Sequence, residues 1–274
     1  MRILLTGAGG QLGHAIQGIF SNHEVFAYNR RQLDIIHLEA VRAAVTTHAP
    51  DLVLNAAAYN AVDQAERDPE AAYRGNALGP RNLALVTAAR GIPLLHMSTN
   101  YVFDGLSRRP YHEFDMPRPQ SVYGQGKLAG EEAVRALNPK HYIVRTSWLY
   151  HTHGNNFIKT MRALSQQPEV RVVDDQFGSP TYAPHLAAAL VQLVTTEAFG
   201  TYHMAGRGGT SRFDLIQTLY TLLGIRSQVK PIPSTEMPRL AKCPSYAELT
   251  TLQEPAIHLP AWQDGLAQFV QSAL

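Results

Sequence analysis

A tyrosine and a lysine stand four residues apart in the segment S-V-Y-G-Q-G-K-L-A-G-E, residues 121–131. In a helix, this spacing places the side chains of Tyr123 and Lys127 on one face. A phenol can donate a proton, but its usual pKa of about 10 is high for exchange at neutral pH. A nearby ammonium favours the phenolate, so we expect Lys127 to lower the pKa of Tyr123 toward the working range of a general acid. The spacing alone decides nothing, because Tyr-x-x-x-Lys also occurs on ordinary helix surfaces.

A second pair of polar side chains follows a short apolar run. Residues 94–105 read L-L-H-M-S-T-N-Y-V-F-D-G, which predicts a strand over 93–97 that delivers Ser98 and Thr99 to its carboxyl end. Open parallel sheets bind ligands at that end of their strands. The hydroxyl of Thr99 can therefore hydrogen-bond a substrate oxygen if Tyr123 lies beside it.

The elements that must position these groups alternate between strands and helices. Short apolar runs are separated by longer segments with helical spacing, of which 11–20 is the first. This alternation predicts a parallel sheet covered by helices on both faces, an α/β fold of the doubly wound Rossmann type. The predicted strands are 2–6, 24–28, 51–54, 93–97, 142–145 and 201–204.

The turn after the first predicted strand is rich in glycine. It reads G-A-G-G-Q-L-G from Gly7 to Gly13, with a strand before it and a helix after it. In that context, glycine lets the backbone approach a pyrophosphate, and the helix N-terminus supplies amide donors. We therefore predict that the loop binds a dinucleotide, through Gly7, Gly10, Gln11, Leu12 and Gly13, although it can also be read as a purely structural turn.

The end of the second predicted strand bears on the choice of dinucleotide. An acid there typically binds the ribose 2′-hydroxyl of NAD, whereas arginine suits the 2′-phosphate of NADP. This chain has Asn29, Arg30 and Arg31, and no acid before Asp34. The pattern favours NADPH over NADH, with contacts from Asn29, Arg30, Asp34 and Ile35. The alternative is that both arginines simply face solvent.

Composition excludes several other functions. The chain has 274 residues, a net charge of +2 and one cysteine, Cys243. It contains no basic run for nucleic acid, no apolar stretch long enough to span a bilayer and no recognisable signal peptide. A single cysteine cannot form an intrachain disulfide. We therefore expect a soluble, cytoplasmic protein whose lone thiol is structural or incidental.

The regular alternation loosens after residue 150, where Gly-, Pro- and Thr-rich segments separate shorter helices. We expect a cofactor-binding domain over 1–150, to which 170–205 return. A smaller, interleaved C-terminal substrate-binding part is expected over 151–169 and 206–274.

Motifs spread along the whole chain resemble those of the extended short-chain dehydrogenase/reductases, and within them the dTDP-4-dehydrorhamnose reductase family. Beyond the glycine loop, they are N-A-A-A-Y-N-A-V-D-Q-A-E (55–66), N-A-L-G-P-R-N-L-A (76–84), S-T-N-Y-V-F-D-G (98–105), Y-G-Q-G-K-L-A-G-E (123–131), R-T-S-W-L-Y (145–150), G-N-N-F-I-K-T-M (154–161), D-D-Q-F-G-S-P-T (174–181), Y-H-M-A-G (202–206) and L-P-A-W (259–262). Several of these are more specific than Tyr-x-x-x-Lys.

The resemblance implies reduction of the 4-keto group of a nucleotide-linked 6-deoxy sugar by NADPH or NADH. The product would be dTDP-L-rhamnose, for cell-surface polysaccharide such as lipopolysaccharide. Tyr123 would be the proton donor, Lys127 its partner and ribose ligand, and Thr99 the residue at the carbonyl oxygen. Further cofactor contacts would come from Asn55, Ala56, Ala57, Tyr59 and Ser98, and substrate contacts from Thr99, Tyr101, Val102, Trp148, Asn155 and Asn156.

The chain departs from the family pattern at a few positions. Asn100 replaces an aspartate, Gly126 a serine or threonine, Cys243 an arginine and Ala247 a serine. These departures leave the exact sugar and nucleotide open.

Two other readings of the same fold remain. One is an epimerase or dehydratase; Asn100 follows Thr99 where many dehydratases have an acid, which argues against a dehydratase. A non-catalytic regulatory subunit is disfavoured because Thr99, Tyr123 and Lys127 are all present. Some family members hold magnesium at a dimer contact through glutamates, but those positions have no match here. We predict no metal site, and a homodimer is one arrangement that the resemblance allows.

Overall fold

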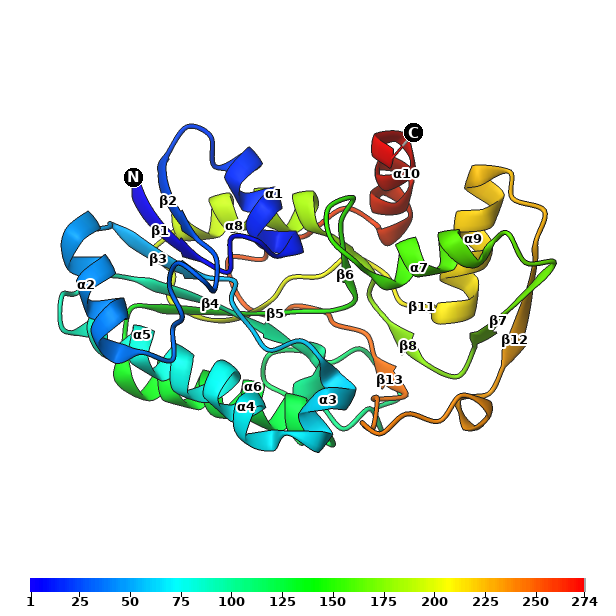
Figure 1. The fold of residues 1–274 in the computed structure, drawn as a ribbon, viewed down its shortest axis with the longest axis horizontal. Coiled ribbons are helices and arrows are strands. Elements are labelled where there is room, and N and C mark those ends of the chain that lie inside the picture. Colours follow the sequence, from blue (N-terminus) through cyan, green and yellow to red (C-terminus); the bar gives the residue numbers. More distant parts are fainter. Residues whose placement is uncertain (274) are drawn as a thin grey trace.

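The computed structural model describes residues 1–273, and a six-stranded parallel sheet forms the centre of its larger part (Figure 1). The strands lie in the order β10-β5-β4-β3-β1-β2. They are β1 (Arg2–Thr6), β2 (Glu24–Tyr28), β3 (Leu52–Asn55), β4 (Leu94–Thr99), β5 (His141–Thr146) and β10 (Gly200–His203). The direction of strand addition reverses between β1 and β3, where doubly wound sheets bind their ligands.

Helices cover both faces of this sheet, because alternate strand residues point to opposite sides. Ile3 and Leu5 belong to a core shared with α1 and α8, whereas Leu4 lies in a core shared with α2, α5 and α6. The bounds are α1 (Gln11–Ile19), α8 (Ala183–Val194), α2 (Leu38–His48), α5 (Gly79–Ala88) and α6 (Val122–Leu137). The predicted α/β doubly wound fold is confirmed.

Every strand predicted from an apolar run is present, with ends shifted by at most two residues. The largest shift is at β4, which continues to Thr99 because Ser98 and Thr99 stay paired with β5. Between β3 and α5, the chain forms short helices that pack against α6. They are α3 (Val62–Arg67), α4 (Pro69–Tyr73) and a π-helical turn (Arg74–Leu78).

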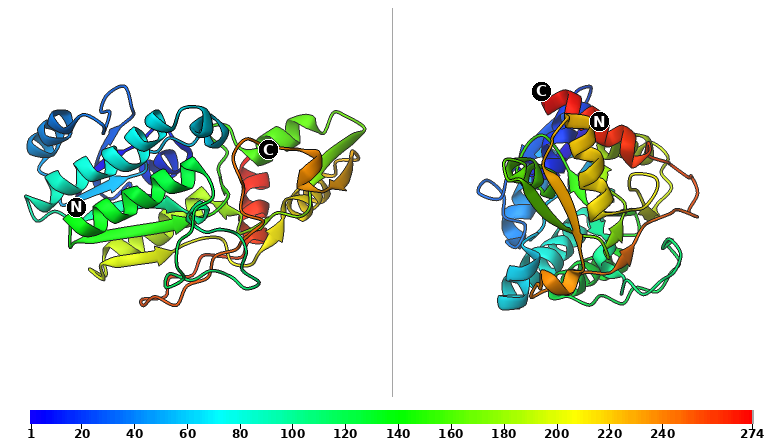
Figure 2. Two further views of the ribbon diagram at one scale, coloured as in Figure 1. Left: turned by 90° about the horizontal axis from the view of Figure 1, so that it is seen from below. Right: turned by 90° about the vertical axis from the view of Figure 1, so that its right-hand side faces the viewer.

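The smaller part has its own core, built on short strands and on helices from the second half of the chain. Its strands pair as β6 (Leu149–Tyr150) with β9 (Thr181–Tyr182), β7 (Glu169–Val173) with β12 (Gln228–Ile232), and β8 (Phe177–Gly178) with both β11 (Thr210–Ser211) and β13 (Tyr246–Ala247). Its helices are α7 (Phe157–Leu164), α9 (Arg212–Leu223) and α10 (Trp262–Ala273). Figure 2 shows this part projecting beside the sheet.

The chain passes between the two parts more than once. Within 170–205, α8 and β10 lie with the large sheet, whereas β7, β8 and β9 pair inside the smaller part. We therefore propose that the return to the cofactor part begins near residue 183, because α8 is the first element after β9 to pack on α1.

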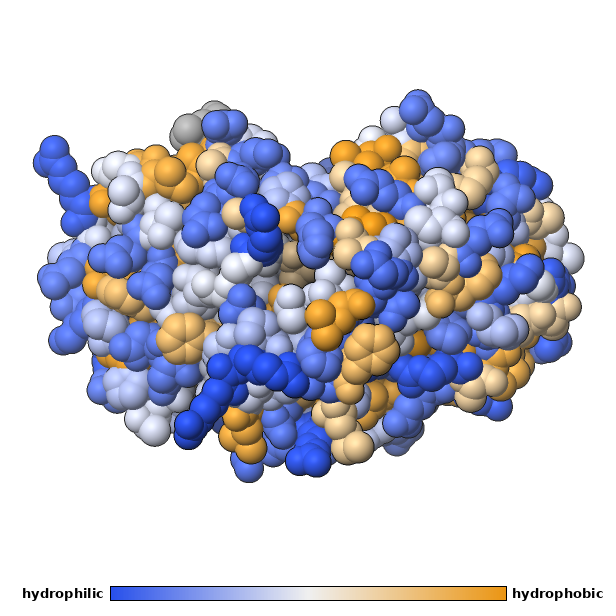
Figure 3. Space-filling model, turned by 180° about the vertical axis from the view of Figure 1, so that it is seen from behind, coloured by the Kyte–Doolittle hydropathy of each residue, from blue (hydrophilic) through white to orange (hydrophobic). Residues whose placement is uncertain are grey.

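The molecule has a notch between its two parts, visible from behind at the upper edge in Figure 3. The surface seen there is mostly hydrophilic, with small scattered apolar patches. Within residues 1–273, no helix combines the length and the apolar character needed to cross a membrane.

Candidate active site

Two connected cavities lie at the carboxyl ends of β1, β3 and β4. The central cavity, of about 430 Å³, is lined by residues of both parts. The outer cavity, of about 290 Å³, extends toward the end of β2. They form a continuous groove because they share the lining residues Gly10, Ala56, Ala58 and Asn60.

The glycine loop forms the corner between these cavities. Gly7 has φ +76°, and a Cβ on it would lie 2.4 Å from the Ala57 nitrogen. Gly13 packs beneath it, where a Cβ would lie 2.3 Å from the Gly7 carbonyl oxygen. Helix α1 starts after Gly10 without a side-chain cap or an acid in its first turn. Its end therefore presents backbone amides and the positive end of its dipole to an anion, which fits a dinucleotide pyrophosphate.

The outer cavity holds the residues predicted to select the cofactor. Asn29, Arg30, Asp34 and Ile35 all line it, as do Ala57 and Tyr59. The Arg30 Nε donates to the Asp34 carboxylate at 3.1 Å, and the arginine side chain is largely exposed. Arg31 does not line this cavity, so of the two arginines it is Arg30 that is placed to meet a 2′-phosphate.

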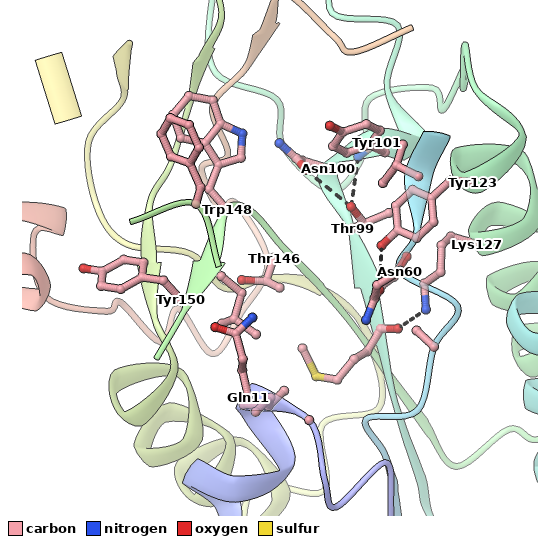
Figure 4. Close-up of a pocket in the computed structure, with 18 of the residues that line it drawn as sticks. Gln11, Asn60, Thr99, Asn100, Tyr101, Tyr123, Lys127, Thr146, Trp148 and Tyr150 are labelled. Atoms are coloured by element: carbon pink, nitrogen blue, oxygen red, sulfur yellow. Dashed lines mark hydrogen bonds between the residues drawn. The ribbon is translucent and has the colours of Figure 1, made fainter. Parts of the chain in front are cut away.

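The three predicted catalytic residues, Thr99, Tyr123 and Lys127, meet on one wall of the central cavity (Figure 4). Thr99 ends β4, and Tyr123 and Lys127 leave the same face of α6. The phenol of Tyr123 donates to Asn60 Oδ1 at 3.4 Å and is also hydrogen-bonded to Thr99. Lys127 Nζ donates to the Met97 carbonyl oxygen at 2.6 Å.

Burial controls the proton affinities of this pair. It raises the pKa of Tyr123 to about 12, against a smaller lowering by the Thr99 hydrogen bond. It lowers the pKa of Lys127 to about 8, against the opposing charge of Glu131. The expectation that Lys127 lowers the pKa of Tyr123 is therefore wrong for this structure, because the amine is directed at Met97 and both groups are desolvated. The phenol stays protonated at neutral pH, which is the form that a proton donor needs.

A buried ion pair supports this wall from behind. Glu131 lies one helical turn after Lys127 and receives two hydrogen bonds from Arg145, from Nε at 2.9 Å and from Nη2 at 2.6 Å. Ser98 also donates to Glu131, at 2.5 Å. Ser98 lines the cavity, but its hydroxyl is committed to this carboxylate, which ties β4, β5 and α6 together.

Trp148 forms the opposite wall, as Figure 4 shows. It lies just after β5 with φ 42°, a left-handed conformation that is uncommon for a residue with a side chain. Its indole packs onto Gly178, where a Cβ would lie 2.6 Å from the ring. The guanidinium of Arg212 lies 4.3 Å from the ring centroid. Such strain is retained where the surroundings fix it, and it often marks a ligand site.

The other predicted site residues fall into two groups. Ala56, Gln11, Leu12 and Tyr101 line the central cavity. Asn55, Val102, Asn155 and Asn156 do not.

The second group has other contacts. Asn55 is buried and bonds Thr6 and His96, so it shapes the chain before Ala56. Val102 is buried in a small apolar cluster, and Asn155 is exposed. Asn156 caps α7 and donates to Gln11 Oε1 at 3.0 Å, which joins the smaller part to the glycine loop.

Comparison with known proteins places this geometry in a family. The model of the RmlD substrate binding domain matches residues 1–274. The chain belongs to this family. A dTDP-4-dehydrorhamnose reductase from Mycolicibacterium smegmatis is 40% identical, over all of this chain and 86% of the relative. A dTDP-4-keto-6-deoxy-D-glucose reductase from Streptomyces niveus is 43% identical, over 90% of this chain and 88% of the relative.

A solved structure gives the same assignment. The dTDP-4-dehydrorhamnose reductase from Bacillus anthracis, in complex with NADP, superposes with a TM-score of 0.96 at 36% identity and covers 99% of both chains. The resemblance to this family that the motifs predicted is therefore confirmed, over the full length of the chain.

The departures from the family pattern lie at or near the central cavity. Asn100 lines it, and its amide donates to Ser147 Oγ at 2.9 Å and to the carbonyl of Ala247 at 3.2 Å. Cys243 Sγ accepts a hydrogen bond from the Tyr101 hydroxyl at 3.4 Å. Gly126 faces Asn76. A Cβ added at Gly126 would lie 3.4 Å from the Asn76 Cβ, which is an ordinary contact distance. The contacts of Asn100 with Ala247 and of Tyr101 with Cys243 join the larger part to the smaller part.

Several residues that line the central cavity are not among the site residues predicted from the sequence. Asn60 lies within the motif of residues 55–66, which is the signal that could have identified it. Thr146 follows β5, and its hydroxyl is buried without a partner, which leaves a polar group for a ligand. Arg212 is an isolated arginine at the start of α9, with no motif around it. The remaining ones are Ala58, Val62, Met97, Asn100, Leu149, Tyr150, Phe157, Ile158 and Leu215.

His151 and His153 lie close to a third histidine, His14 of α1. The rings of His14 and His153 stack with centroids 4.2 Å apart. Within residues 1–273, no three His, Cys, Asp or Glu side chains are arranged to hold a metal ion.

Proposed function

We propose that this protein is an NADPH- or NADH-dependent reductase of the 4-keto group of a dTDP-linked 6-deoxy sugar. One observation carries the proposal: Thr99, Tyr123 and Lys127 share one wall of a cavity that is continuous with the glycine loop. The names of the relatives, which are reductases of dTDP-4-keto sugars, supply the substrate class.

The chain's own groups account for the proton transfer. The reduced nicotinamide would supply the hydride. Thr99 is placed to orient the carbonyl oxygen beside the Tyr123 phenol, and the phenol donates its proton to that oxygen as negative charge develops there. A proton held with a pKa of about 12 is retained at neutral pH until a stronger base forms next to it.

Lys127 acts as the fixed cation of the site. Its pKa of about 8 leaves it mostly protonated at neutral pH. The ammonium is anchored on the Met97 carbonyl and can also hold ribose hydroxyls. The glycine loop with the start of α1 would hold the pyrophosphate, and the outer cavity the adenosine.

The sugar is the finer part of the proposal. We favour dTDP-4-dehydrorhamnose, with dTDP-L-rhamnose as product for cell-surface polysaccharide. The relative from Streptomyces niveus supports a second candidate, reduction of a dTDP-4-keto-6-deoxy-D-glucose. A cytoplasmic location, expected from the sequence, and a homodimer, which the resemblance allows, stay predictions.

The test is an assay of NADPH oxidation with each of the two dTDP-4-keto sugars generated in situ. The configuration of the product is read by NMR. Consumption with dTDP-L-rhamnose as product supports the first candidate, and consumption with only the other sugar supports the second. Cofactor binding without turnover of either sugar contradicts the reductase and favours the non-catalytic subunit.

A further inference from the structure

The charged residues that line the central cavity are Lys127 and Arg212, and its described lining contains no aspartate or glutamate. The two cations are placed differently. Lys127 is anchored on a backbone carbonyl and lies one helical turn from Glu131. Arg212 comes from the other side of the cavity, from the first turn of α9 in the smaller part.

The guanidinium of Arg212 is held in place by neutral groups. It lies 4.3 Å from the ring centroid of Trp148 and 5.0 Å from that of Phe157. Its Nε donates to Gln176 Oε1 at 3.0 Å. Within residues 1–273, no carboxylate pairs with it, and burial lowers the pKa of the guanidinium. Desolvating a cation without a counter-charge is costly, so this arrangement suits a site that an anion completes.

A nearby arginine provides the contrast. Like Arg212, Arg239 interacts electrostatically with Tyr101 and Cys243. Its Nη2 donates to Asp63 at 2.7 Å and its Nε to the same carboxylate at 3.0 Å. Arg239 is therefore neutralised within the protein, whereas Arg212 keeps an unbalanced charge at the cavity wall.

We propose that Arg212 binds the diphosphate of the nucleotide-sugar and thereby sets the sugar ring between Trp148 and Thr99. This inference rests on the proposed function. The planar guanidinium can donate two parallel hydrogen bonds to phosphate oxygens, and its stacking on Trp148 fixes the plane of those donors. The pyrophosphate of the cofactor is the less fitting anion, because the glycine loop lies in the larger part and already offers helix amides.

The test measures ligand binding by calorimetry, with dTDP, thymidine and NADPH as probes. In the wild-type protein, thymidine should bind at least about 10-fold more weakly than dTDP, because it lacks the charged groups. Arg212→Gln should weaken dTDP binding by about 10- to 100-fold while the dissociation constant of NADPH stays unchanged. Arg226→Gln is the matched control, because Arg226 is exposed just after the same helix.

Kinetics and folding controls complete the test. Arg212→Gln should raise the KM for the dTDP-4-keto sugar by a larger factor than it lowers kcat. Arg212→Met keeps an unbranched side chain against Trp148 and Phe157. It replaces Arg212→Gln in the same measurements if the Gln variant does not fold. Equal wild-type affinities for thymidine and dTDP overturn the inference, as does an unchanged dTDP affinity in a folded variant. Weakened NADPH binding with dTDP unaffected would assign Arg212 to the cofactor instead.

The two proposals fail separately. Suppose that the wild-type protein reduces neither sugar, and that the Arg212→Gln variant binds dTDP more weakly than the wild-type protein does. The diphosphate site then stands, and the proposed reductase activity does not. If the wild-type protein is a reductase and Arg212→Gln leaves both KM and dTDP binding unchanged, only the role of Arg212 is wrong.

Discussion

At the scale of single residues, the site depends on a phenol that burial keeps protonated. Tyr123 is 8% exposed and shares hydrogen bonds with Thr99 and Asn60. The sequence places Tyr123 next to Lys127 but does not reveal how dry their surroundings are. The direction in which the pKa of Tyr123 shifts from its usual value therefore follows only from the folded structure.

Replacing the phenol tests its role directly. Tyr123→Phe should lower kcat by at least about 10²-fold, because the general acid is lost. The dissociation constant of NADPH should stay the same, as measured by fluorescence titration. Tyr73→Phe is the control, since Tyr73 is exposed and lies outside both cavities. A turnover rate near that of wild type in Tyr123→Phe would remove the proposed donor.

Arg30 is expected to give a preference for NADPH over NADH. It lines the outer cavity, whereas its neighbour Arg31 is exposed and does not. Arg30→Ala should weaken NADPH binding by roughly 10-fold and leave NADH binding nearly unchanged, because only the former has a 2′-phosphate. Arg31→Ala should change neither affinity. Equal affinities of the wild-type protein for the two cofactors would contradict the preference.

At the scale of elements, helix α6 aligns the catalytic pair. Ser121 caps it, since its hydroxyl accepts the Gly124 amide at 3.2 Å. Glu131 then ties the helix to Arg145 of β5 and to Ser98 of β4. The position of Tyr123 relative to Thr99 is thus set by a cap at one end of the segment and a buried ion pair one turn after Lys127.

Removing the cap should loosen this helix start. Ser121→Ala should lower the free energy of unfolding by about 1 kcal/mol, as for other N-caps. Urea denaturation measures the change. Ser272→Ala, in the exposed last turn of α10, should shift stability by less than about 0.5 kcal/mol. Equal effects of the two substitutions would show that the Ser121 hydroxyl is not acting as a cap.

The strands of the large sheet were predictable because buried parallel strands are short apolar runs bounded by glycine or helical segments. The smaller part was not, because strands such as β6 and β9 have only two residues and their pairing depends on distant segments. The same reason separates the site residues. Gly7, Thr99 and Tyr123 lie in local motifs that predict their roles. Arg212 has no such motif and reaches the cavity only because α9 folds against Trp148.

At the scale of the whole molecule, buried histidines link stability to pH. Burial lowers the pKa of His203 to about 4 and that of His96 well below its usual value. The Nε2 of His203 faces Arg145 Nη1 at 3.4 Å, and the other ring nitrogen lies near carbonyl oxygens. A proton on Nε2 would place two cations together, so the folded protein holds this ring neutral.

The sign of the pH dependence follows from these shifts. The unfolded chain takes up protons on these histidines below about pH 6.5, whereas the folded chain does not. The melting temperature should therefore fall as the pH drops from about 6.5, with the His203 contribution ending near its folded pKa of about 4. Thermal unfolding, followed at a series of pH values between about 6.5 and 4, measures this fall in the melting temperature. His203→Gln should flatten the profile, whereas His258→Gln, at an exposed position, should not. A melting temperature that is constant between pH 6.5 and 5 would contradict the prediction.

The interleaving of the two parts also bears on how the chain folds as the ribosome releases it. The large sheet receives its last strand at His203. The smaller core brings Tyr150 against Phe269, with ring centroids 5.6 Å apart. A nascent chain can therefore complete the sheet and its glycine loop well before the last helix emerges to close the other core. For that interval, Trp148 and the apolar residues around it lie in an incomplete wall, and such transiently exposed apolar surface favours aggregation.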